Sequence, residues 1–193
     1  MQTIKNHNTM KQFLKMTLPV AAVVLLAACG GGKAPEKEAA KDDHAGHNHA
    51  TEQAAPAGAV TLKDDKLQAV YQHYVHLTTA LVNGDAAEAK IASNAIETGA
   101  KAVTGGEKIA ADAAKIIAAA DIDAQRTIYS SLSNEFITLV KKSGLSSGEL
   151  YVDFCPMALN DKGGYWLSAA KDIKNPYFGE SMLTCGEVKE TIQ

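Results

Sequence analysis

The hydrophobic pattern beyond residue 60 predicts a run of amphipathic helices. Between residues 61 and 82, apolar side chains recur every three or four positions, at Leu67, Val70, Tyr71, Tyr74, Leu77 and Leu81. That spacing places them on one face of a helix. Thr61 with Asp64 predicts a capping-box start, and Asn83-Gly84 predicts the end of the helix.

Three more helices are expected, separated by short turns. They are predicted over residues 85–103, 107–120 and 121–143, with Gly144 as the final stop. The second is lined by small residues, and the fourth carries Ile128, Leu132, Phe136, Leu139 and Val140 on one face. Short connections make consecutive helices antiparallel neighbours. The prediction is therefore a mainly α fold, an up-down bundle of about four helices.

The pattern changes after Gly144. Residues 149–154 alternate and are β-prone, which predicts a short strand, and the following stretch is rich in turn-forming and aromatic residues. We expect an irregular C-terminal cap with short β structure that folds over the bundle. Trp166 and Phe178 are interpreted as packing anchors rather than ligand contacts.

The first residues have the pattern of an export signal. Lysines precede an apolar run over residues 16–26 that is too short to span a bilayer comfortably. Leu26-Ala27-Ala28-Cys29 resembles the lipobox of bacterial lipoproteins, which implies lipidation of Cys29; Met10 is an alternative start. The predicted organisation is a signal peptide over 1–28, a lipid-anchored linker over 29–59 and a helical domain over 60–193.

This leader predicts the location and excludes some partners. Cys29 is followed by Gly30-Gly31-Gly32 with no acidic residue. The resemblance to lipoproteins of two-membrane bacteria then implies the outer membrane, facing the periplasm, with the lipid as the membrane contact. The net charge of −3 and the lack of a basic run predict no nucleic-acid partner. Phosphate-loop, zinc-hydrolase and serine-elbow motifs are absent from the sequence, so we predict that the protein is not an enzyme.

Beyond Cys29, the sulfur of the chain lies in two clusters. These are Cys155-Pro156-Met157 and Met182-Leu183-Thr184-Cys185. Thiolate and thioether ligands favour Cu(I) and related soft metals, so Cys155, Met157, Met182 and Cys185 are candidate metal ligands if the clusters meet. If only the cysteines meet, a disulfide is expected in an oxidising compartment. Both alternatives stay open at this point.

Histidines supply a second set of candidate ligands. His44, His47 and His49 lie within the linker and can chelate Cu(II), Zn(II) or Ni(II) weakly; the alternative is a polar tether. His73 and His76 lie one turn apart on the first predicted helix. They are either auxiliary metal ligands or surface residues beside the core stripe.

The C-terminal third resembles a known family. The run Tyr151 to Ala158, the segment Gly164 to Ser168, Asn175 to Gly179, and Met182-Leu183 with Cys185-Gly186 are similar to the domain of unknown function 3347. The resemblance extends over the helices, from about residue 62 to 192. That family occurs in exported bacterial proteins and is also appended to periplasmic adaptor subunits of heavy-metal efflux systems.

The resemblance implies a helical periplasmic domain associated with copper or related metals, with the four sulfur residues on its pattern. Together with the histidines, it favours an envelope lipoprotein that binds a soft metal, copper in particular, for sequestration or handover to heavy-metal efflux components. The alternative is a non-catalytic envelope binding module in which Cys155 and Cys185 form a structural disulfide.

Overall fold

The structure is a computed structural model that describes residues 59–193. The expected signal peptide, the lipidation site Cys29 and the linker histidines His44, His47 and His49 lie outside the described residues. The helices are α1 (Asp65–Asn83), α2 (Ala86–Ala100), α3 (Glu107–Ala118), α4 (Ile122–Ser143), the short α5 (Ala158–Asp161) and the 3-10 turn η1 (Gly179–Met182). The strands are β1 (Thr61–Leu62), β2 (Leu145–Ser147), β3 (Leu150–Cys155), β4 (Gly164–Ser168) and β5 (Glu187–Ile192).

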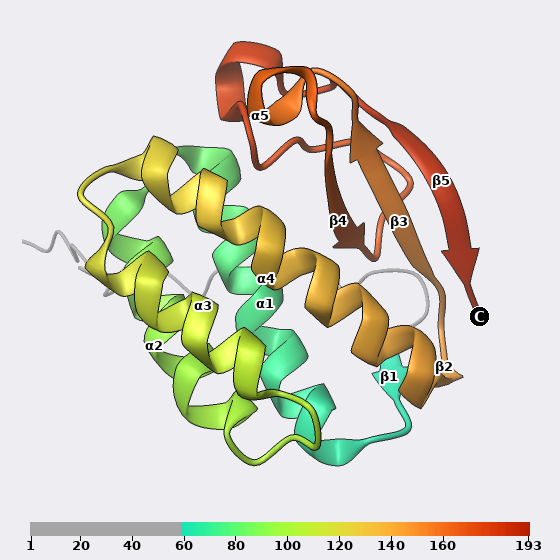
Figure 1. The fold of residues 1–193 in the computed structure, drawn as a ribbon. Helices are drawn as coiled ribbons and strands as arrows, with labels where there is room; N and C mark the ends of the chain where they lie inside the picture. Colours follow the sequence, from blue (N-terminus) through green and yellow to red (C-terminus); the bar gives the residue numbers. More distant parts are fainter. Residues whose placement is uncertain (1–58) are drawn as a thin grey trace, which may run out of the picture. The chain divides into compact units, whose positions relative to one another are not determined.

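The mainly helical architecture with a C-terminal β cap is confirmed (Figure 1). Consecutive helices α1 to α4 pack against one another, and α4 also contacts α1. Asp85 and Asp121 cap α2 and α4 through their carboxylates, which accept backbone N–H groups of the first turn. Gly84 ends α1 at φ 71°, in the left-handed region that glycine adopts without strain.

The capping box at Thr61 is wrong. Thr61 and Leu62 form β1, which pairs with β2, and the cap of α1 is Asp64, whose carboxylate accepts the N–H groups of Lys66 and Leu67. Leu62 is buried, and its N–H donates to Oε1 of Gln68 over 2.7 Å. The extended backbone therefore carries Leu62 into the core, and the helix begins one turn later than the prediction.

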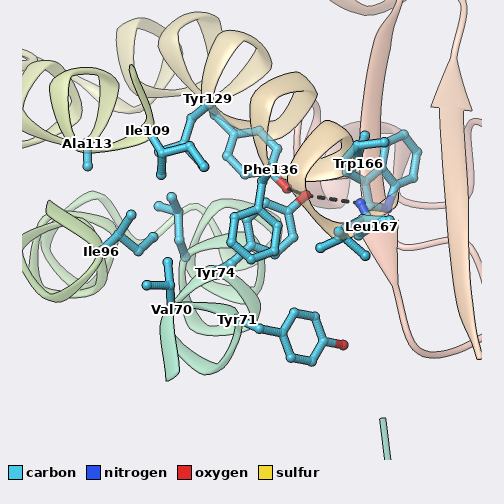
Figure 2. Close-up of a cluster of buried hydrophobic side chains, with 14 of the residues drawn as sticks. Val70, Tyr71, Tyr74, Ile96, Ile109, Ala113, Tyr129, Phe136, Trp166 and Leu167 are labelled. Carbon is cyan, nitrogen blue, oxygen red and sulfur yellow. Dashed lines mark hydrogen bonds between the residues drawn. The ribbon is translucent and has the colours of Figure 1, made fainter. Parts of the chain in front are cut away.

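The bundle core is built on stacked aromatic rings (Figure 2). The rings of Tyr74 on α1 and Phe136 on α4 stack with centroids 4.6 Å apart and planes at 8°. The Tyr74 hydroxyl lies in the middle of this core. It contacts Ser133 Oγ at 2.8 Å and accepts hydrogen bonds from the Tyr129 hydroxyl at 2.9 Å and the Leu167 N–H at 3.0 Å. Since Leu167 belongs to β4, this hydroxyl ties the cap to two helices.

The C-terminal cap is a three-stranded antiparallel sheet in the order β4-β3-β5. The predicted strand near residues 149–154 is confirmed as β3, the central strand. Trp166 and Leu167 of β4 are buried, and β4 packs along α4, as Figure 1 shows. The edge strand β5 is exposed at nearly every residue, so it carries no alternating apolar signal that the sequence pattern could reveal.

Replacing Tyr74 by Phe removes a fully buried hydroxyl and leaves the Leu167 N–H without its acceptor. We expect Tyr74→Phe to lower the free energy of unfolding by about 1–3 kcal/mol, measured by denaturant titration. Tyr165→Phe makes the same chemical change at a ring with 38% exposure and serves as the control. Equal losses in the two variants would contradict the anchoring role of Tyr74.

Candidate functional site

Cys155 is the last residue of the central strand and is fully buried, with 0% exposure. It lies opposite Gly164 of β4 in the sheet register. The chain after it passes Pro156 and Met157 and reverses through residues 158–161 into β4. Leu159, Asn160 and Asp161 all have positive φ, between 57° and 62°. Left-handed backbone costs roughly 1–2 kcal/mol per non-glycine residue, so this turn is a strained connection beside the cysteine.

Cys185 lies in the segment between η1 and β5 and is half-buried. Its N–H donates to the Met182 carbonyl over 3.1 Å. Its carbonyl accepts a hydrogen bond of 2.8 Å from the side-chain amide of Asn175. The backbone position of Cys185 is therefore fixed by hydrogen bonds rather than by a strand.

Asn175 organises this segment from a fully buried position. Besides its bond to Cys185, its N–H donates to the Leu183 carbonyl at 2.8 Å, and its side-chain oxygen accepts the Tyr177 N–H at 2.8 Å. Its own carbonyl accepts the Gly179 N–H at 3.0 Å. One residue thus closes the loop over residues 175–185 and sets where the Cys185 sulfur lies.

Arg126 of α4 fastens the same loop to the bundle. Its Nε donates to the Pro176 carbonyl at 3.0 Å and its Nη2 to the Leu81 carbonyl at 2.9 Å. Gly179 packs so closely here that a β-carbon would lie 2.6 Å from the Val82 carbonyl oxygen. Because its φ is also +57°, only glycine fits this position without strain. The loop that carries Cys185 is therefore held against the ends of α1 and α4.

These two placements bring the cysteine sulfurs together. The Sγ atoms of Cys155 and Cys185 are 2.9 Å apart, across 30 positions of sequence, and both thiols are free. A disulfide has its sulfurs about 2.05 Å apart. A tetrahedral metal with metal–sulfur bonds of about 2.3 Å holds two sulfurs about 3.8 Å apart. The observed separation lies between these two values, so either arrangement requires the sulfurs to move.

The contact changes the acidity of the half-buried Cys185 thiol. The hydrogen bond with the Cys155 sulfur raises the pKa of Cys185, and burial raises it further. Cys185 therefore keeps its proton more firmly than an isolated thiol. A metal ion or an oxidant that engages the pair has to displace that proton.

The methionines differ in their surroundings. Met157 has 48% exposure, so its thioether is not packed in the core. Met182 is half-buried at the end of η1, one turn before Cys185.

The helix histidines point to solvent. His73 and His76 are exposed on α1, and Nε2 of His76 lies 3.0 Å from the Glu88 carboxylate of α2. Within residues 59–193, no three or more His, Cys, Asp and Glu side chains are grouped so that they could hold a metal ion. In this part of the chain, the structure thus brings together the two thiols and does not add His73 or His76 to them.

A groove of about 710 Å³ lies between α1 and the C-terminal cap. Its walls include Tyr71 and Val75 of α1, Trp166 of β4, and Leu183 from the turn before Cys185. No histidine, cysteine or methionine lines this groove, so it is separate from the sulfur pair. None of the described helices has the length and apolar character that crossing a membrane requires.

The sequence pattern did not single out Asp153, Asn175 or Arg126. Asp153 has 0% exposure on β3, and neither carboxylate oxygen has a hydrogen-bond partner among the described residues. Strand alternation places it on the same sheet face as Cys155. Burial raises its pKa to about 7, from 3.8. The only hint in the sequence was one acidic residue within an otherwise apolar strand. That hint looked like the usual alternation of polar and apolar residues along a half-exposed strand.

The buried carboxyl predicts a pH-dependent stability. Since the pKa of Asp153 is higher in the folded protein, its stabilising contribution is complete below about pH 4 and is lost as pH rises through about 7. Above that pH, we expect Asp153→Asn to be more stable than the parent, by at most about 4 kcal/mol, and the advantage to vanish near pH 4. Denaturant titrations across this range test it, with exposed Asp172→Asn as control. A pH-independent difference would contradict the burial of an ionisable carboxyl.

Comparison with known proteins gives one match. Residues 70–148 match the family model described as "Protein of unknown function (DUF3347)", which covers most of α1 and continues through β2. The match ends before β3, so Cys155 and Cys185 lie outside it. No curated protein and no solved structure matches the chain. The resemblance to the DUF3347 family is thus confirmed over residues 70–148.

Proposed function

We propose that this protein is a non-catalytic, lipid-anchored module of the cell envelope that binds a soft metal ion, Cu(I) in particular, for sequestration or handover to efflux components. The observation that carries the proposal is the 2.9 Å contact between the Cys155 and Cys185 sulfurs. Two separate segments, each with its own hydrogen bonds, converge on that contact.

The donor set supports a soft and low-coordinate metal. Thiolates and thioethers favour Cu(I) over hard cations. A structural zinc site needs four ligands drawn from cysteine, histidine and carboxylates, and residues 59–193 contain no group of even three. Two thiolates, with thioethers two and three residues away along the chain, match Cu(I), which accepts fewer ligands than zinc. The exposed Met157 and the half-buried Met182 are the available thioethers.

The surroundings of the pair suit uptake and release rather than permanent storage. Cys185 is half-buried, so an ion can reach its sulfur from solvent, whereas Cys155 supplies a second sulfur from inside the sheet. His44, His47 and His49 in the linker would collect metal near the same domain. Cys29 would hold the module at the membrane, where efflux components take over the ion.

Anaerobic Cu(I) titration of the full chain tests the proposal. The chain carries Cys29→Ser, so that Cys155 and Cys185 are its two thiols. We expect one Cu(I) per chain, measured by competition with a chromophoric chelator, and its loss in a variant with Cys155→Ser and Cys185→Ser. Unchanged affinity in that double variant would exclude the site.

Further variants separate the ligands. Replacing Met157 and Met182 by Leu conserves volume, so we expect a Cu(I) affinity lower by about tenfold or more with little change in stability. Replacing His44, His47 and His49 by Ala should leave Cu(I) affinity intact and remove weak Cu(II) binding. If the histidine variant loses Cu(I) instead, the metal is held by the linker and not by the thiol pair.

The same 2.9 Å contact also supports a second proposal, in which Cys155 and Cys185 form a structural disulfide in an oxidising compartment. A bond between Cys155 and Cys185 would close a loop of about 30 residues and stabilise the fold by about 3–4 kcal/mol in the chain-entropy account. Under this alternative, the protein is a binding module whose cap is locked by the bond.

Mass spectrometry of freshly isolated protein without reductant distinguishes the two states. A mass lower by two hydrogens identifies the disulfide, and reduction should then lower the free energy of unfolding by about 3–4 kcal/mol. Two titratable thiols in protein taken directly from the envelope support the metal-binding state. Unfolding that is insensitive to reduction would contradict the structural role of the bond.

A further inference from the structure

The two thiols of the pair are not equivalent. Cys155 ends the central strand of the sheet with 0% exposure, while Cys185 is half-buried on the covering loop. A molecule in solvent can approach the Cys185 sulfur directly. The same molecule can reach the Cys155 sulfur only if the sheet opens or if the loop over residues 175–185 moves away from Cys155.

The two backbones are also held differently. Cys155 belongs to β3, which has hydrogen-bonded neighbours, β4 and β5, on its two sides. Cys185 is held by the Asn175 amide and by a turn bond to the Met182 carbonyl. Small rotations of the Cys185 side chain therefore need fewer broken hydrogen bonds than any movement of Cys155.

We propose, on the basis of the metal-binding function above, that the pair is an asymmetric thiol–disulfide exchange site for small disulfides, in which Cys185 reacts first and Cys155 resolves. The contact, the unequal exposure and the unequal anchoring of the two sulfurs are the features on which this rests. Exchange then regulates the metal site, because formation of the bond consumes both thiolate ligands.

The reaction has two balanced steps. Deprotonated Cys185 attacks one sulfur of a small disulfide, RSSR; a protein–S–SR bond forms, the RS–SR bond breaks, and RS⁻ leaves and takes up a proton. Cys155 then loses its proton and attacks Sγ of Cys185, which breaks the mixed bond and releases the second RS⁻. Two electrons pass from the two protein thiols to the disulfide, which leaves as two thiols.

The second step needs no rearrangement of the fold. The Cys155 sulfur already lies 2.9 Å from the Cys185 sulfur, within reach of attack.

Oxidised glutathione is the probe, with metal-free full chain carrying Cys29→Ser. We expect Cys155→Ser to accumulate a glutathione adduct on Cys185, and Cys185→Ser to react at Cys155 at a rate about tenfold or more slower, read by intact mass. The parent should pass through the adduct to the internal disulfide. Similar rates in the two single variants, or no adduct in Cys155→Ser, would overturn the assignment.

Folding and metal binding are checked separately. Far-UV circular dichroism must show both variants folded; if the buried hydroxyl of Cys155→Ser prevents folding, Cys155→Ala replaces it. Exchange that fails in a protein that still binds Cu(I) overturns the exchange proposal alone. Exchange that proceeds in a protein that does not bind Cu(I) overturns the metal function and leaves a redox module.

Discussion

The hydroxyl of Tyr74 is the contact on which the geometry of the cap depends. It lies in the core and joins Ser133 and Tyr129 of α4 to the backbone N–H of Leu167 in β4. A helix bundle and a small sheet have few polar groups with which to fix their relative position, because apolar packing is weakly directional. A buried hydroxyl with these three partners supplies direction. Since β4 pairs with β3 along its length, the same contact fixes where Cys155 lies relative to the bundle.

The second half of the site is fixed by different groups. Arg126 binds the Pro176 carbonyl, and Asn175 binds the carbonyl of Cys185, so the loop is attached to α4 at one end and to the cysteine at the other. Two independent sets of hydrogen bonds therefore place the two sulfur atoms next to each other. Under the proposed function, metal uptake and oxidation would compete for the same two thiols, whose sulfurs are 2.9 Å apart.

The helices were predictable because their signals are local. The apolar stripe from Leu67 to Leu81 predicted α1, and the carboxylates of Asp85 and Asp121 indicated the starts of α2 and α4. The strand pairing of Thr61 was not predictable, since a two-residue strand has no periodicity and its partner Ser147 lies far along the chain. β5 was missed for a related reason: nearly all of its residues are exposed, and only Val188 and Ile192 are apolar. The meeting of Cys155 and Cys185 was an open alternative in the sequence. The role of Asn175 in holding the loop over residues 175–185 became visible only from its hydrogen bonds.

X-ray absorption at the copper edge of the Cu(I)-loaded full chain is the most direct test of the central claim. The protein would carry Cys29→Ser and Ala at His44, His47 and His49, so that the folded domain supplies the ligands. The account predicts a first shell made of sulfur, which is lost when Cys155 and Cys185 are replaced by Ser. A first shell of nitrogen and oxygen, or sulfur that persists without these two cysteines, would contradict it.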